Sequence, residues 1–97
     1  MSKWRRNPRV DDNQAEIVKA LRKIPGVTVS LGHDDFLLGY KGQTYWYELK
    51  TPDKLKKNGE WKAGALKATQ CHLLNNWRGH YRVVCFLDEI LDELGIS

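Results

Sequence analysis

Asp35, Glu48 and Lys50 are side chains whose types and spacing could do chemistry together. If residues 35–50 form a β-hairpin with Lys41-Gly42 as its two-residue turn, Asp35 lies opposite Glu48, with Lys50 on the same face. Opposed side chains have Cβ atoms about 5 Å apart, so two carboxylates there repel unless a divalent cation or a shared proton neutralises them. Oxygen ligands without His or Cys favour Mg²⁺ or Mn²⁺ over zinc. Such an ion can activate a water and offset charge on a phosphate.

An ordinary surface arrangement also fits these residues, with Lys50 pairing with Glu48 along an edge strand. The choice depends on the hairpin register, because a slip of one residue would move Asp35 to the other face of the sheet. The spacing alone leaves both alternatives open.

Two predicted helices add polar residues to this neighbourhood. Glu16 lies at the border of an apolar helix face, about 40° from Ala20. It could join the carboxylates or be a solvated glutamate. Gln70 interrupts an apolar stripe expected to pack on the sheet, so its amide should either bond to a group at the sheet or satisfy the first turn of its own helix. The other members of that stripe are Leu66, Leu73, Leu74 and Trp77.

The elements that must position these residues follow the order α-β-β-β-α-β-α. This order predicts a single α/β domain with a mixed β-sheet flanked by helices.

Asp11 and Gln14 have the spacing of a capping box at the start of the first helix. Residues 51–66 are polar and Lys-rich and are predicted to form a long loop. The predicted elements are a helix from Asp11 or Asp12 to a Pro25-Gly26 stop, strands at 27–31, 36–40 and 44–49, a helix at 67–77, a strand at 81–86 and a helix at 87–94.

Length and composition exclude several classes of protein. Ninety-seven residues with 41% hydrophobic content make one domain and leave no room for a separate cofactor domain. Cys71 and Cys85 are too few for a disulfide framework and lack the spacing of a zinc site. No apolar run could span a bilayer, so no membrane association is expected. The net charge of +4 suggests a polyanionic partner.

Residues 1–10 are predicted to be a basic flexible arm, and residues 11–97 the folded domain. The arm carries Lys3, Arg5, Arg6 and Arg9 but no apolar segment that would make it a signal peptide. A cytoplasmic location is expected from this and from the sparse cysteine usage.

Beyond these residue-level arguments, the chain resembles a known family. The matching segments are 32–40 (Gly-His-Asp-Asp-Phe-Leu-Leu-Gly-Tyr), the strand end Glu48-Leu49-Lys50, and 66–70 (Leu-Lys-Ala-Thr-Gln), leading to 76–79 (Asn-Trp-Arg-Gly). They are similar to the VRR-NUC (virus-type replication-repair nuclease) domain of the PD-(D/E)XK nuclease superfamily. The similarity runs from about Asp12 to Gly95, and the expected order of elements agrees with that family.

The resemblance implies a PD-(D/E)XK nuclease-like fold and metal-dependent hydrolysis of DNA phosphodiester bonds with Mg²⁺ or Mn²⁺. By position it implies that Asp35 and Glu48 are metal ligands, with the Leu49 backbone carbonyl as a third, and that Lys50 positions or helps to activate the attacking water. It implies that Glu16 acts through a metal-bound water and that Gln70 orients Lys50 or the scissile phosphate.

Two positions depart from the family pattern. Asp34 stands where the family usually has Pro before its motif aspartate, which leaves open whether Asp34 also contributes to the metal site. Lys67 stands where the family usually has a Ser or Thr helix cap.

Standalone members of this size resemble phage or bacterial proteins that act as structure-selective endonucleases, including resolvases of four-way (Holliday) junctions. Paired cuts across a junction need two active sites, so a homodimer is expected, in the cytoplasm of a bacterial or phage-infected cell. We expect DNA contacts to follow the phosphate backbone and to weaken steeply with salt. The predicted contact residues are Arg5, Arg6, Lys54, Lys56, Lys57, Trp61 and Lys62.

Other functions remain compatible with the sequence. A nucleic-acid-binding module without catalysis would bind DNA or RNA regardless of Mg²⁺ and of Glu48. A structural or interaction protein would carry the same carboxylates as surface charges. Nucleases that prefer flaps, duplex DNA or RNA would share the chemistry and differ in substrate.

Overall fold

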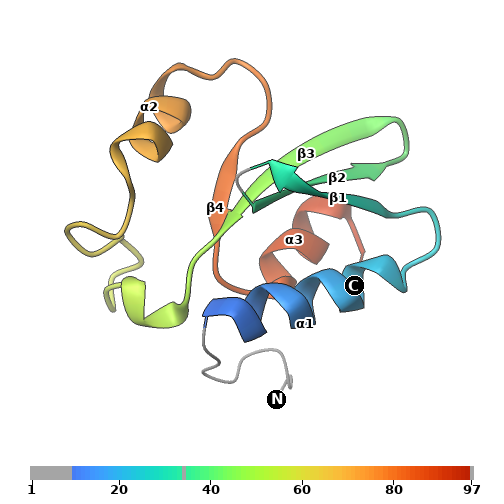
Figure 1. Ribbon diagram of the computed structural model, residues 1–97, viewed down its shortest axis with the longest axis horizontal. Coiled ribbons are helices and arrows are strands. Elements are labelled where there is room, and N and C mark those ends of the chain that lie inside the picture. The colour runs from blue at the N-terminus through green and yellow to red at the C-terminus, as the bar shows by residue number, and fades with distance from the viewer. Residues whose placement is uncertain (1–9, 34, 97) are drawn as a thin grey trace.

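Three α-helices and four strands follow one another in the order that the sequence predicts (Figure 1). The computed structural model describes residues 10–33 and 35–96. Among these, none of the helices is long and apolar enough to cross a bilayer. The elements are α1 (Val10–Arg22), β1 (Thr28–His33), β2 (Asp35–Tyr40), β3 (Gln43–Leu49), the 3₁₀ helix η2 (Pro52–Lys54), α2 (Ala68–Asn76), β4 (Arg82–Val84) and α3 (Leu87–Leu94).

The strands form one mixed sheet in the order β1-β2-β3-β4, with β4 parallel to β3 and the other pairs antiparallel. The β2–β3 hairpin turns at Lys41 (φ 52°) and Gly42 (φ 78°), whose positive φ angles suit a tight hairpin turn. The ladder runs from Tyr40 opposite Gln43 to Phe36 opposite Tyr47, which confirms the predicted register.

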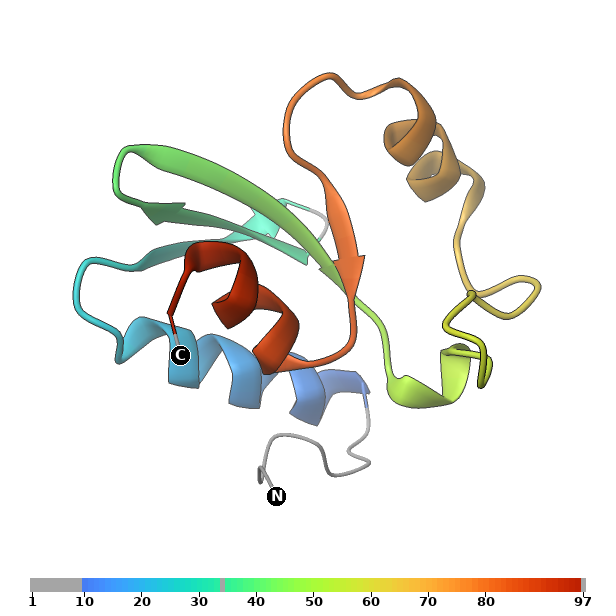
Figure 2. The same ribbon diagram turned by 180° about the vertical axis from the view of Figure 1, so that it is seen from behind.

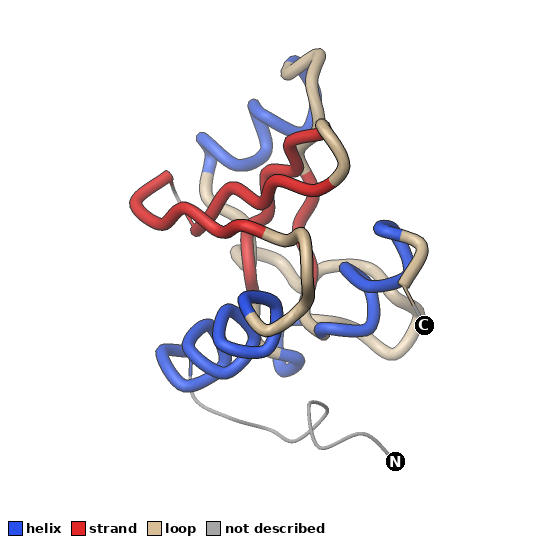
Figure 3. Tube along the Cα trace, turned by 90° about the vertical axis from the view of Figure 1, so that its right-hand side faces the viewer, coloured by secondary structure: helices blue, strands red, loops and turns tan. Residues whose placement is uncertain are grey.

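Helices α1 and α3 lie together on one face of the sheet, and α2 lies on the other side (Figures 1–3). Side chains alternate along β3, so Tyr47 points to the α1–α3 side while Trp46 points to the opposite side. Burial of apolar side chains from both helices and from the sheet provides the main stabilisation of this layer. The fully buried members are Ile17, Leu21, Phe36, Leu38, Tyr47, Val84 and Ile90.

Two expectations from the sequence need correction. Residues 51–66 are more ordered than a plain loop, because η2 is followed by an antiparallel bridge between Leu55 and Trp61. The apolar stripe of α2 does not pack on the sheet as a whole, since Leu74 is 43% exposed and Trp77 is 52% exposed. Trp46 on this sheet face packs edge-on against Trp77 from the stripe and against Tyr81, so the stripe meets the sheet through Trp77.

The hairpin turn yields a test of the register. A non-glycine residue in the left-handed region is strained by about 1–2 kcal/mol, and Asn tolerates this region better than Lys. We expect Lys41→Asn to stabilise the fold by about 0.5–1 kcal/mol, raising Tm by a few degrees in a thermal melt. Gly42→Ala should lower stability by about 1 kcal/mol. Equal melting temperatures for the two variants would contradict the turn geometry.

Candidate active site

Asp35 is held by hydrogen bonds from two other elements. It is the first residue of β2 and follows a register irregularity in β1 at Gly32, whose φ of 91° is readily adopted only by glycine. One carboxylate oxygen, Oδ1, accepts a hydrogen bond from Gln14 Nε2 of α1 at 3.1 Å. The other, Oδ2, accepts from the Leu49 backbone N–H at the end of β3. The carboxylate is therefore held against the last residues of β3.

Glu48 and Lys50 form a largely buried ion pair beside this point. Lys50 Nζ lies 3.5 Å from Glu48 Oε2, with only 14% and 10% of the two side chains exposed. The Lys50 backbone N–H donates to the Val84 carbonyl at 2.9 Å, which continues the β3–β4 ladder by one residue. The local backbone of the lysine is thus held by the sheet.

We call Gln14, Asp35, Glu48, Leu49 and Lys50 the hairpin-end site. The structure brings the Asp35 carboxylate to the Leu49 amide and Lys50 to Glu48, and the ladder that ends at Phe36 opposite Tyr47 places the predicted pair Asp35 and Glu48 next in register. The catalytic and metal-binding roles of these residues stay predictions.

The oxygen donors of the hairpin-end site fit a hard divalent cation. Mg²⁺ is usually held by one or two carboxylates, with waters and substrate phosphates completing its shell. Asp35 and Glu48 supply two carboxylates at adjacent strand ends, and the Leu49 carbonyl lies in the chain between Glu48 and Lys50. Within the described part of the chain, no three Asp, Glu, His or Cys side chains form a group that could hold a metal ion. Two carboxylates and a backbone carbonyl are oxygen donors of the kind that Mg²⁺ and Mn²⁺ take, and metal binding by them stays a prediction.

Among the described α1 side chains, Gln14 hydrogen-bonds to Asp35, whereas the sequence pointed to Glu16. Glu16 is exposed and lies about 200° around the helix from Gln14, away from the buried face that carries Ile17 and Leu21. The sequence did contain a signal for Gln14, because it precedes Ile17 by three residues and Leu21 by seven and so shares their face. Its capping-box spacing with Asp11 led to a different interpretation. The role predicted for Glu16 stays a prediction.

Gln70 is buried, with 5% exposure, and takes the helix-end role rather than a bond at the sheet. Its Oε1 accepts a hydrogen bond from the Lys67 backbone N–H at 2.9 Å, which satisfies a group at the start of α2. Lys67 has no acceptor to return the bond, so only half of a capping box forms. The role predicted for Gln70 at the hairpin-end site stays a prediction.

The lysines predicted to contact DNA are exposed on the segment that directly follows the site. This segment, residues 51–66, is called the basic loop below. Trp61 is half-buried, its backbone pairs with that of Leu55 in an antiparallel bridge, and the Lys62 N–H donates to the Lys54 carbonyl at 2.8 Å. The loop therefore holds its cations on an ordered backbone. The exposed lysines are Lys54, Lys56, Lys57 and Lys62. Arg5, Arg6 and Asp34 lie outside the described residues.

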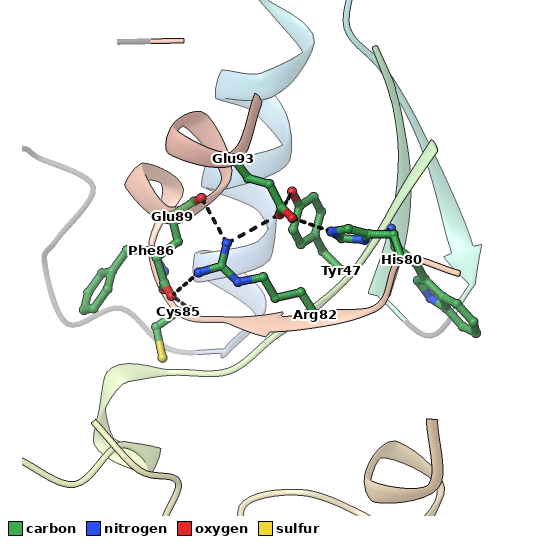
Figure 4. Close-up of polar contacts among 8 residues, drawn as sticks. Tyr47, His80, Arg82, Cys85, Phe86, Glu89 and Glu93 are labelled. Carbon is green, nitrogen blue, oxygen red and sulfur yellow. Dashed lines mark hydrogen bonds and ion pairs between the residues drawn. The ribbon is translucent and has the colours of Figure 1, made fainter. Parts of the chain in front are cut away.

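A second polar group, on the α3 side of the sheet, is structural (Figure 4). Glu93 of α3 accepts hydrogen bonds from Tyr47 Oη at 2.5 Å and from His80 Nε2 at 2.9 Å. Because the Trp46 backbone N–H donates to His80 Nδ1 at 3.0 Å, the ring proton lies on Nε2 and is directed at Glu93. Arg82 Nη1 lies 3.4 Å from Glu93. These contacts tie α3 to β3 and β4.

The network shifts the acidity of its members. Burial raises the pKa of Glu93, but the hydrogen bonds from Tyr47 and His80, with the charge of Arg82, outweigh it and leave the pKa below its usual value. Burial and the hydrogen bond to Glu93 raise the pKa of Tyr47 well above its usual value. Tyr47, His80 and Glu93 are far apart in the sequence, so helix and strand periodicity does not indicate that they bond to one another.

No protein-family model, curated protein or solved structure matches the chain.

The Glu93 network predicts a pH dependence of stability. A carboxylate whose pKa is lowered in the folded state stabilises the fold above its unfolded pKa, near 4.5, and this stabilisation is lost as pH falls through the folded pKa. We expect Glu93→Gln to lower the free energy of unfolding at neutral pH and to flatten its fall in acid, measured by urea unfolding. Glu60→Gln, in the exposed basic loop, is the control with unchanged stability. Identical acid profiles for wild type and Glu93→Gln would contradict the role of the network.

Proposed function

We propose that this chain is a metal-dependent DNA endonuclease of the VRR-NUC type, with a PD-(D/E)XK nuclease-like arrangement of its α/β fold. The observation that carries the proposal is the hairpin-end site itself. Asp35 is held at the Leu49 amide beside the Glu48–Lys50 pair, and the basic loop begins directly after Lys50. An acidic pair with an adjacent lysine, next to a cationic surface, suits attack on a phosphodiester bond.

Asp35 and Glu48 would hold Mg²⁺ or Mn²⁺, with the Leu49 carbonyl as a further oxygen ligand. Such an ion, when bound, supplies charge stabilisation at a phosphate and lowers the pKa of water. Gln14 and the Leu49 N–H donate to Asp35, so this carboxylate keeps its orientation without substrate. Preorganised groups avoid the cost of reorientation during the reaction.

Lys50 would act on the reacting phosphate. Its ammonium group is within 3.5 Å of Glu48 and only slightly exposed, so it lies in surroundings that screen charge less than water does. There it can orient the attacking water and stabilise the negative charge that builds on the phosphate oxygens. The water oxygen gives up a proton and bonds to phosphorus as the bond from phosphorus to the 3′ oxygen breaks. The 3′ oxygen takes up a proton, so the products are a 5′-phosphate and a 3′-hydroxyl.

We further propose branched DNA, above all the four-way junction, as the substrate, and a homodimer as the active form. One chain of this size carries one such site, whereas symmetric cuts on two strands need two sites related by a two-fold axis. The exposed lysines of the basic loop suit recognition of backbone shape rather than base sequence.

A cleavage assay tests the proposal directly. Purified protein is incubated with labelled four-way junction, flap and linear duplex DNA, each with Mg²⁺, with Mn²⁺ and with EDTA. We expect metal-dependent cutting that falls by about 10²–10⁴-fold in Glu48→Gln, the range for loss of a positioned catalytic group. Asp92→Asn is the matched control, because it also removes one carboxylate charge, at an exposed position of α3 outside the basic loop, and should cut at the wild-type rate.

Each outcome of this assay decides between functions. Symmetric paired nicks on the junction would support the resolvase, and preferential cutting of flap or duplex DNA would support a nuclease of that specificity. No cutting by folded protein, with DNA binding indifferent to metal and to Glu48→Gln, would replace the nuclease by a binding module.

The contact between Gln14 and Asp35 predicts which α1 residue supports cleavage. Gln14→Ala removes a hydrogen bond to a charged group, so we expect the rate to fall by about tenfold, the equivalent of about 1.5 kcal/mol. Glu16→Ala, on the exposed face, should cut at close to the wild-type rate. Loss of activity in Glu16→Ala alone would instead support the role implied by the family resemblance. Thermal melts of both variants check that the fold is intact.

A further inference from the structure

A groove of about 480 Å³ lies between α1 and the edge strand β1. None of the residues assigned above to DNA contact lines it. Its described lining contains three cations and no carboxylate. The lining residues are Gln14, Ala15, Val18, Lys19, Arg22, Lys23 and Leu31.

Helical spacing explains how these residues share one wall. Gln14, Val18 and Arg22 are four residues apart and form one row along α1, while Ala15, Lys19 and Lys23 form the neighbouring row. The two rows place apolar and amide groups toward the start of the helix and cations toward its end.

Arg22 links helix α1 to strand β1 by a hydrogen bond. Its Nη2 donates to the Val29 carbonyl of β1 at 3.0 Å, so the guanidinium already has a structural partner. Lys19 and Lys23 are exposed beside it and can reach a ligand. On the opposite wall Leu31 is 48% exposed, an unusual degree of exposure for a large apolar side chain in a strand.

The groove leads directly to the hairpin-end site. Gln14 lines the groove and also donates to Asp35 Oδ1 at 3.1 Å, so one residue belongs to both. Along α1, Arg22 lies eight residues or about 12 Å beyond Gln14. That length matches the axial rise of roughly three to four nucleotides in one strand of a duplex, at about 3.4 Å each.

We propose that this groove binds the phosphodiester backbone of the DNA strand that continues from the hairpin-end site, with Lys19 and Lys23 contacting successive phosphates. The ligand class follows from the three cations of the described lining and from the continuity with the site. The apolar surfaces of Ala15 and Leu31 suit the deoxyribose rings between the phosphates. This inference rests on the proposed function, and it adds a second cationic surface to the basic loop.

Cations in the last turn of a helix also stabilise that helix through its dipole. The variants must therefore separate DNA binding from folding. Lys19→Gln and Lys23→Gln each remove one charge, whereas Lys19→Arg and Lys23→Arg keep it. Lys41→Asn removes one charge at the far end of the β2–β3 hairpin and is the matched control. Arg22 is left in place because it bonds to β1.

Binding is measured by fluorescence anisotropy on a labelled four-way junction in EDTA, so that cleavage does not interfere, over a range of salt concentrations. Each phosphate contact contributes about 0.9 to the slope of log affinity against log salt, which corresponds to about eightfold in affinity near 0.1 M salt. We expect each Lys→Gln variant to bind the junction about eightfold more weakly near 0.1 M salt, and its slope of log affinity against log salt to be shallower by about 0.9. The Lys→Arg variants should keep wild-type binding, and Lys41→Asn should change it little.

The outcomes distinguish the groove from the nuclease. If Lys19→Gln and Lys23→Gln bind like Lys41→Asn while wild type cuts DNA, the groove assignment is wrong and the proposed function stands. If the groove variants lose binding but wild type cuts no substrate, the groove is supported and the nuclease is not. Absence of DNA binding by the wild type at low salt would overturn both.

Discussion

The register of the β2–β3 hairpin determines where Asp35, Glu48 and Lys50 lie relative to one another. A slip of one residue would send Asp35 to the opposite face and leave Glu48 without its neighbour. The register is set by the Lys41-Gly42 turn, at the other end of the hairpin, whose two positive φ angles allow only a tight connection. The chemistry at one end of the sheet thus depends on backbone conformation at the other end.

Patterns of neighbouring residues in the sequence correctly predicted the parts of the fold that are fixed by interactions between neighbouring residues. The hairpin register and the limits of α3 follow from turn chemistry, from alternation and from the Gly95 stop, and the structure agrees with both. The contact between Gln14 and Asp35 was missed because it joins residues far apart in the chain, and because a capping interpretation already explained Gln14. The Glu93 network and the groove depend on how helices dock on the sheet, which periodicity alone does not specify.

The hairpin-end site balances much of its charge internally. Glu48 is paired with Lys50, and Asp35 accepts hydrogen bonds from a side-chain amide and a backbone amide. Partly buried carboxylates are tolerated only with such partners. The same partners fix the orientation of the two carboxylates, so the contacts that make their burial tolerable also hold them in one conformation.

The parallel pairing of β3 with β4 has a consequence for the order of folding. Asp35 and Glu48 are brought together by a hairpin, which closes a very short loop and forms quickly. Lys50 is held by Val84, and this contact forms only after residues 51–83, including α2, have closed a much longer loop. We therefore expect the nascent chain to assemble its acidic pair before its lysine is fixed. A ribosome-bound or truncated chain that ends before β4 would then carry the acidic pair without the lysine held in place, and the complete hairpin-end site would form only with the last strand.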